Sequence, residues 1–128
     1  MSPALKPAGP NVQVFGTPDS QSTRAALRFF KERRIEPHVI DIRRKPMAPG
    51  ELRRFVERLG ARGLADTESK TWREAGLGYL SMTDADLAER LLADQRLLKL
   101  PLVRIDNGFA AGRDEAGWKA LLAKATPT

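Results

Sequence analysis

The chain has 128 residues, enough for one domain with a sizeable core, and its 41% hydrophobic and 30% charged residues are ordinary for a globular protein. It has no cysteine and a single histidine, His38, which excludes disulfides, thiol chemistry and a multi-histidine metal site, so we expect no metal. The formal charge of +6 permits an acidic partner without requiring one. No apolar run is long enough for a membrane span, and we expect a cytoplasmic protein.

The N-terminal part predicts a strand, a helix and a second strand. Residues 1–11 have no apolar segment and are expected to be a flexible leader. Residues 12–15 form an apolar run that ends in turn residues, which is typical of a buried strand. Ser20 or Ser22 can cap the helix that follows. Residues 38–42 then predict a second strand, and a strand, helix and strand in this order imply a parallel pair with a right-handed crossover.

The middle of the chain predicts a helical insert at about residues 47–95. Apolar residues recur at helical spacing in residues 51–59, and Gly60 and Gly63 are expected to end that helix. A short helix from Thr67 to about residue 75 should bury Trp72. A further helix should begin at Thr83, where Asp86 three residues later gives a weak capping box.

The C-terminal part predicts a β-hairpin and a final helix. Apolar residues flank Asn107-Gly108, a strong hairpin signal, and the last helix should bury Trp118. We therefore expect one domain over residues 12–122, with a tail at 123–128. The order β-α-β, helical insert, β-β-α is that of a thioredoxin-like α/β fold with a mixed central sheet.

Four segments carry a family resemblance that covers residues 12–122. Residues 15–26 follow, without a gap, the run aromatic-x-x-P-x-C-x-x-C-R-K-A. Residues 67–72 are similar to T-R-S-K-x-aromatic, residues 97–103 to L-I-K-R-P-I-V, and residues 112–118 to G-F-x-x-x-x-W. In this order and spacing they resemble the Spx/ArsC (arsenate reductase-like) family.

The resemblance implies that the redox site has degenerated. Ser20 stands at the position of the nucleophilic cysteine, Thr23 at that of the second cysteine in Spx-type members, and Leu100 at that of an arginine. Pro101 should be the cis-proline that faces the active-site turn. A serine becomes a nucleophile when a base lies beside it, and nothing in the sequence brings His38 to Ser20. Ser20 is therefore expected to act as a helix cap, and Asp19 should repel an anionic substrate.

Three interpretations from different classes follow. The first is a non-catalytic interaction or regulatory module, since the resemblance to Spx-type proteins implies RNA polymerase as a partner. The second is a binding site for glutathione or an oxyanion, made by Ser20, Arg24 and Pro101 at a helix N-terminus. The third is an arsenate reductase by family membership, but that reaction needs a thiol. We expect no resident cofactor, no direct nucleic-acid binding and a monomer.

Overall fold

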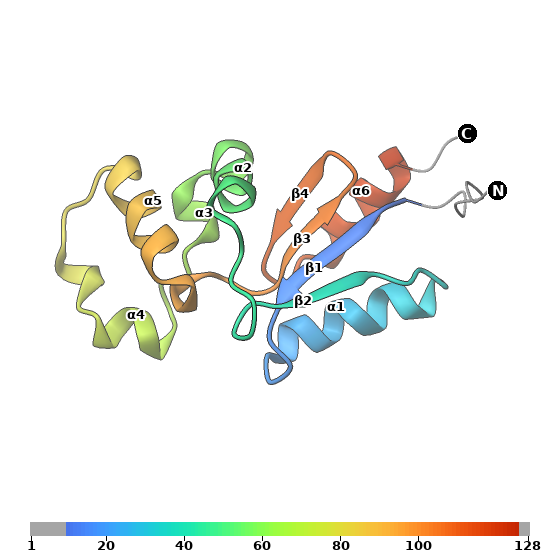
Figure 1. Ribbon diagram of the computed structural model, residues 1–128, viewed down its shortest axis with the longest axis horizontal. Coiled ribbons are helices and arrows are strands. Elements are labelled where there is room, and N and C mark those ends of the chain that lie inside the picture. Colours follow the sequence, from blue (N-terminus) through green and yellow to red (C-terminus); the bar gives the residue numbers. More distant parts are fainter. Residues whose placement is uncertain (1–9, 126–128) are drawn as a thin grey trace.

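The computed structural model describes residues 10–125, so residues 1–9 of the expected leader and 126–128 of the expected tail lie outside the described part. The elements, shown in Figure 1, follow in the order β1 (Val12–Gly16), α1 (Gln21–Glu32), β2 (His38–Asp41), α2 (Pro49–Leu59), α3 (Ala61–Leu64), α4 (Lys70–Glu74), η2 (Leu77–Tyr79), α5 (Asp84–Ala93), η3 (Gln95–Leu97), β3 (Leu102–Ile105), β4 (Gly108–Ala111) and α6 (Glu115–Ala125).

The four strands form one mixed sheet, as predicted, and their order in it is β2-β1-β3-β4. β1 and β2 are parallel, whereas β3 pairs antiparallel with both β1 and β4. Val14 lies opposite Val39 of β2 and opposite Val103 of β3. Since β1 and β2 are parallel and β3 returns, the Ser20 turn after β1 and the segment before β3 meet at one end of the sheet.

Each face of the sheet has its own core, because side chains along a strand alternate between faces. The face covered by α1 and α6 buries Val12, Val14, Ala26, Phe29, Phe30, Val103, Ile105, Ala110 and Trp118. The opposite face packs against α2, and α3, α4 and α5 extend the same apolar cluster away from the sheet (Figure 1). There the Phe55 ring of α2 lies edge-on to Phe15 of β1, at 5.8 Å between centroids, and to Phe109 of β4, at 4.8 Å.

Several local predictions can be compared with the observed elements. The capping box at Thr83 and Asp86 is present with both of its hydrogen bonds, and Trp72 is buried. Gly60 ends α2 with a positive φ of 81°, as predicted, but Gly63 lies inside the short helix α3 rather than at a helix end. No periodicity can be read from four residues, so α3 has no signal in the sequence.

The two ends of the expected domain differ from the sequence-based boundaries. Asn11, placed in the flexible leader, is held by two hydrogen bonds: its N–H donates to Asp106 Oδ1 at 3.0 Å, and its carbonyl accepts from the Asp106 N–H at 2.9 Å. At the other end, α6 continues to Ala125, past the expected domain end at residue 122. Over residues 10–125, no helix has the length and apolar character that crossing a bilayer requires.

Candidate functional site

The turn after β1 holds Ser20 as the cap of α1. The Ser20 backbone is extended, and its N–H donates to the Thr17 carbonyl at 3.1 Å. Its Oγ accepts a hydrogen bond from the Thr23 N–H at 3.1 Å. The hydroxyl oxygen therefore satisfies one of the donors that a helix N-terminus leaves unpaired, which is the role that the sequence predicts for it.

Thr23 lies beneath this turn, with only 2% of its surface exposed. Its Oγ1 has no hydrogen-bond partner among the described residues. The side chain packs directly on Gly16 at the end of β1, so that any Cβ on Gly16 would collide with it. A small cavity of about 120 Å³ adjoins both residues. Thr23 thus fills space at the position of the second cysteine, and its hydroxyl is buried without a bond.

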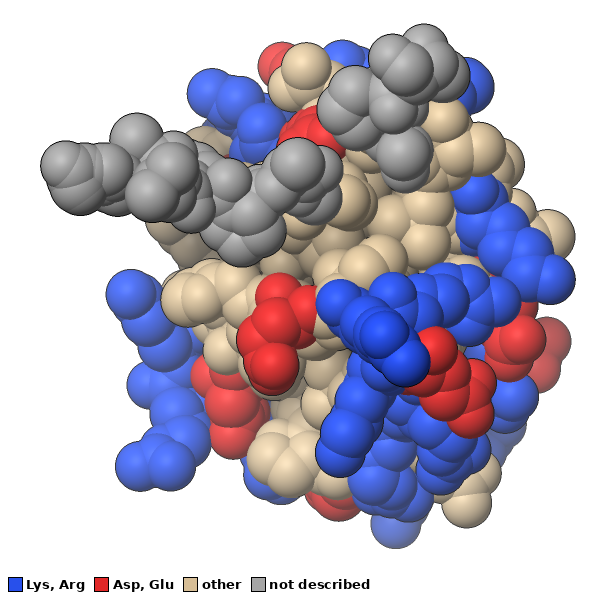
Figure 2. All heavy atoms as spheres, turned by 90° about the vertical axis from the view of Figure 1, so that its right-hand side faces the viewer, with Lys and Arg blue, Asp and Glu red and all other residues tan. Residues whose placement is uncertain are grey.

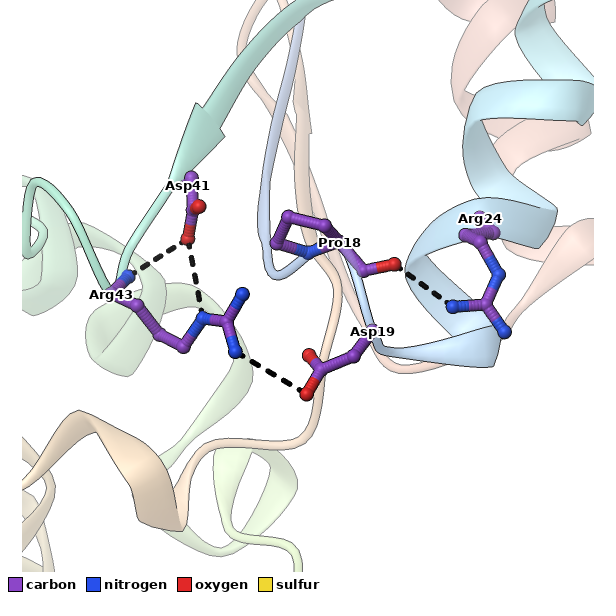
Figure 3. A network of polar contacts seen from close by, with 5 residues as sticks. All are labelled: Pro18, Asp19, Arg24, Asp41 and Arg43. Atoms are coloured by element: carbon purple, nitrogen blue, oxygen red, sulfur yellow. Dashed lines mark hydrogen bonds and ion pairs between the residues drawn. The ribbon is translucent and has the colours of Figure 1, made fainter.

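Charged side chains tie the turn to the end of β2 (Figure 3). Arg43 Nη1 lies 3.3 Å from Asp19 Oδ2, and Arg43 Nε lies 3.8 Å from Asp41 Oδ1. On the other side of the turn, Arg24 Nη1 donates to the Pro18 carbonyl at 2.8 Å. A hydrogen bond from the Thr17 side chain and, secondly, the positive charge of Arg43 lower the pKa of Asp19. A carboxylate therefore stands ionised beside the N-terminus of α1 and opposes the approach of an anion.

The Leu100–Pro101 segment lies at the same end of the sheet. The register pairs Phe15 with Leu102, which places Pro101 beside Gly16. The Leu100–Pro101 peptide bond is cis, as the resemblance implies. Leu100, at the position where the resemblance implies an arginine in redox relatives, packs against the apolar cluster on the α2 side of the sheet.

Among the described residues, no side chain hydrogen-bonds the Ser20 hydroxyl, whose one contact of this kind comes from the Thr23 N–H. His38 is exposed at the start of β2 and pairs with Gln13, whereas Asp41 at the end of β2 pairs with Gly16. At about 3.3 Å per residue, His38 is therefore about 10 Å from the turn along the sheet. The part of the chain that the structure describes has no group of three or more acidic or histidine side chains that could hold a metal. The turn contains neither a thiol nor an activated hydroxyl.

Sequence reasoning named Ser20, Thr23, Arg24 and Asp19 but missed Arg43 and Asp41. Arg43 reaches Asp19 across 24 positions of sequence, and only the parallel pairing of β1 with β2 brings the two together. The one available signal was Asp41 at the end of a predicted strand that runs parallel to the first.

Comparison with known proteins places this geometry in a family. The model of the ArsC family matches residues 15–121. An arsenate reductase of Neisseria meningitidis is 31% identical over 117 residues, covering 88% of this chain and 99% of the relative. The global transcriptional regulator Spx 2 of Oceanobacillus iheyensis is 28% identical over 117 residues, covering 90% of this chain and 86% of the relative.

The fold has solved counterparts as well. The structure of an arsenate reductase from Vibrio cholerae superposes with a TM-score of 0.73 at 19% identity, covering 91% of this chain and 98% of that one. This likeness confirms the thioredoxin-like fold. Together with the match of the family model over residues 15–121, it shows that the chain belongs to the ArsC family, as a member without cysteine.

Proposed function

We propose that this protein is a non-catalytic member of the ArsC family, a cytoplasmic monomer that acts by binding a protein partner and regulating it. The observation that carries the proposal is the state of Ser20. Its oxygen accepts the cap hydrogen bond from the Thr23 N–H, no side chain of residues 10–125 hydrogen-bonds it as a base would, and the chain has no cysteine. Forming a covalent arsenic adduct requires such a nucleophile, so the chemistry of the family's reductases has no attacking group here.

RNA polymerase is the partner that we propose first. The chain is 28% identical to a protein named as a global transcriptional regulator, and its +6 charge favours an acidic protein surface. The test is immobilised RNA polymerase from the source organism, titrated with the purified protein at about 0.15 M salt. Saturable binding supports the proposal, whereas no binding to polymerase contradicts this choice of partner.

A reductase assay tests the non-catalytic part separately. The purified protein is incubated with arsenate, glutathione and glutaredoxin, and turnover is compared with that of buffer and of Ser20→Cys. We expect no turnover by the wild type. Turnover above buffer, or a covalent intermediate on Ser20 seen by mass spectrometry, contradicts the proposal. Turnover by Ser20→Cys alone would show that the surrounding site still supports the reaction once sulfur is returned.

A second candidate function is binding of glutathione or an oxyanion at the same turn. The N-terminus of α1, Arg24 and the cavity of about 120 Å³ favour it, while the ionised Asp19 opposes it. Calorimetry with millimolar glutathione, arsenate or phosphate tests it directly. Heat that saturates and is lost in Arg24→Ala supports a ligand site, and the absence of heat excludes one at that concentration.

A further inference from the structure

One edge of the sheet is open. β2 is the end strand, and no strand of residues 10–125 pairs with its outer side. The Ile42 N–H donates to the Gly16 carbonyl of β1. Because backbone groups along a strand alternate sides, the N–H and C=O of Val39 and the N–H of Asp41 face away from β1. These groups are available to another backbone.

A groove runs along this edge between β2 and α1. Two cavities, of about 120 and 430 Å³, share Leu27 of α1 and Val39 of β2, so they lie next to each other along this edge. Val39 lies in register with Val14 and therefore faces the α1 side of the sheet. It is 49% exposed. The middle of the groove thus has an apolar floor that is only partly covered.

The walls of the groove are mainly basic. Arg24, Lys31 and Arg34 line it, against the carboxylates of Glu36 and Asp41. Lys31 and Arg34 have no side-chain hydrogen bond or ion pair with another described residue, whereas Asp41 is already paired with Arg43. Figure 2 looks onto the end of the molecule where α1 ends, and Lys and Arg side chains gather over its lower part, at the height of α1 in Figure 1.

We propose that this groove, which we call the β2 edge groove and define by Arg24, Leu27, Lys31, Arg34 and Val39, binds an acidic extended segment of a partner protein. The segment would add to the sheet as a fifth strand on β2. An apolar side chain would cover Val39 and Leu27, and acidic side chains would reach the basic wall.

The spacing of the basic wall suits such a strand. Residues of an added strand that face α1 recur about every 7 Å. Arg24 and Lys31 are seven positions apart on α1, about 10 Å along its axis. Their flexible side chains span the difference, so two acidic residues of one strand can each meet a cation.

Charge and hydrogen bonding favour a protein segment over the other occupants. A second copy pairing through β2 would bring Arg24, Lys31 and Arg34 against their counterparts, which repel. A nucleic acid would satisfy the cations, but its phosphodiester backbone has no N–H groups at strand spacing to pair with the outward carbonyl of Val39, as another strand has. An acidic strand meets both requirements.

This inference rests on the proposed function in that it assigns a surface to the partner, but its test needs no polymerase. The probe is a fluorescein-labelled peptide of about eight residues in which glutamate and valine alternate, with a lysine–valine peptide as its control. Anisotropy at about 0.1 M salt measures binding. We expect saturation with the acidic peptide only, and slower amide hydrogen exchange at Val39 and Asp41 in the complex.

Two pairs of matched variants locate the site. Lys31→Glu/Arg34→Glu should raise the Kd for the acidic peptide about tenfold, whereas Arg54→Glu/Lys119→Glu, with the same change of net charge, should change it less than about twofold. Val39→Pro removes an outward N–H and should abolish binding, while Val39→Thr keeps that N–H and should not. Circular dichroism verifies that each variant is folded.

The outcomes separate the two proposals. Four results would each overturn the β2 edge groove as a protein-binding site. Two concern the peptide: no binding of the acidic peptide, or an equal loss of its affinity in both charge variants. The other two concern other occupants: tighter binding of a thymidine oligonucleotide that perturbs the same amides, or self-association that is lost in Val39→Pro. Polymerase binding that survives Lys31→Glu/Arg34→Glu would leave the proposed function intact and move its surface elsewhere. Peptide binding without polymerase binding would leave the groove intact and change the partner.

Discussion

Replacing Thr23 by valine should make the protein more stable, which is unusual for a buried position. Thr23 is 2% exposed, and its Oγ1 has no hydrogen-bond partner among the described residues. A buried hydroxyl without a bond costs about 1–3 kcal/mol. Valine has the same branched shape as threonine, so it still packs on Gly16 and leaves no cavity, and its helix propensity is nearly the same. The substitution therefore removes the cost of the buried hydroxyl without adding a new one. We expect the free energy of unfolding to rise by about 1–2 kcal/mol, and Tm by about 3–8 °C.

Urea denaturation followed by circular dichroism measures this change, with calorimetry for Tm. Thr71→Val, at a half-buried position on α4, is the matched control and should stay within about 0.5 kcal/mol. Thr23→Ser keeps the hydroxyl and loses the methyl group, so it should be less stable than the wild type by about 1 kcal/mol. A Thr23→Val protein that is less stable than the wild type would refute the reasoning, because it would mean that the hydroxyl is bonded, for instance to water in the adjoining cavity.

Three further predictions concern polar contacts. Ser20→Ala removes the cap of α1 and should lower the free energy of unfolding by about 1 kcal/mol in the same urea assay. Glu51→Gln should lower the free energy of unfolding by about 1–3 kcal/mol, because the Arg104 and Glu51 side chains are only 18% and 23% exposed and their charged atoms lie 3.0 Å apart. A double-mutant cycle with Arg104→Met that shows no coupling energy would contradict this. A side-chain hydrogen bond from Arg96 lowers the pKa of Asp94, so Asp94→Asn should lose about 0.5 kcal/mol at neutral pH. A carboxyl group whose pKa is lowered on folding stabilises the folded state at pH values above its unfolded pKa. The difference in stability between wild type and Asp94→Asn should therefore disappear as the pH falls through the lowered pKa of Asp94. A difference that persists at lower pH would show that another interaction causes it.

Much of the fold could be predicted because its signals are local. The apolar run before Gly16, the hairpin signal at Asn107-Gly108 and the Thr83 capping box each act within a few residues, and the strand, the hairpin and the box all form. The turn of the hairpin lies one position earlier than its signal, at Asp106 and Asn107, and Gly108 already pairs with Ile105. The short helix α3 (Ala61–Leu64) and the attachment of Asn11 to Asp106 could not be predicted in this way. A single helical turn has no periodicity, and a contact between residues 95 positions apart depends on the register of β1 with β3.

The candidate site divides along the same physical line. The cap on Ser20 is local and followed from the residue type, whereas the link from Asp19 through Arg43 to Asp41 depends on strand order. The unpaired hydroxyl of Thr23 depends on what lies above it in three dimensions.

The position of Phe55 has a consequence for attempts to shorten this protein. Its ring stands between Phe15 and Phe109, so the stretch from residue 47 to 95 supplies the cover of one whole sheet face. Deleting that stretch would keep all the elements of a minimal β-α-β-β-α unit, but it would expose the rings of Phe15 and Phe109 and the side chain of Leu102 to water. Such a shortened protein would aggregate rather than fold, so the segment inserted between β2 and β3 is required for the stability of the whole domain.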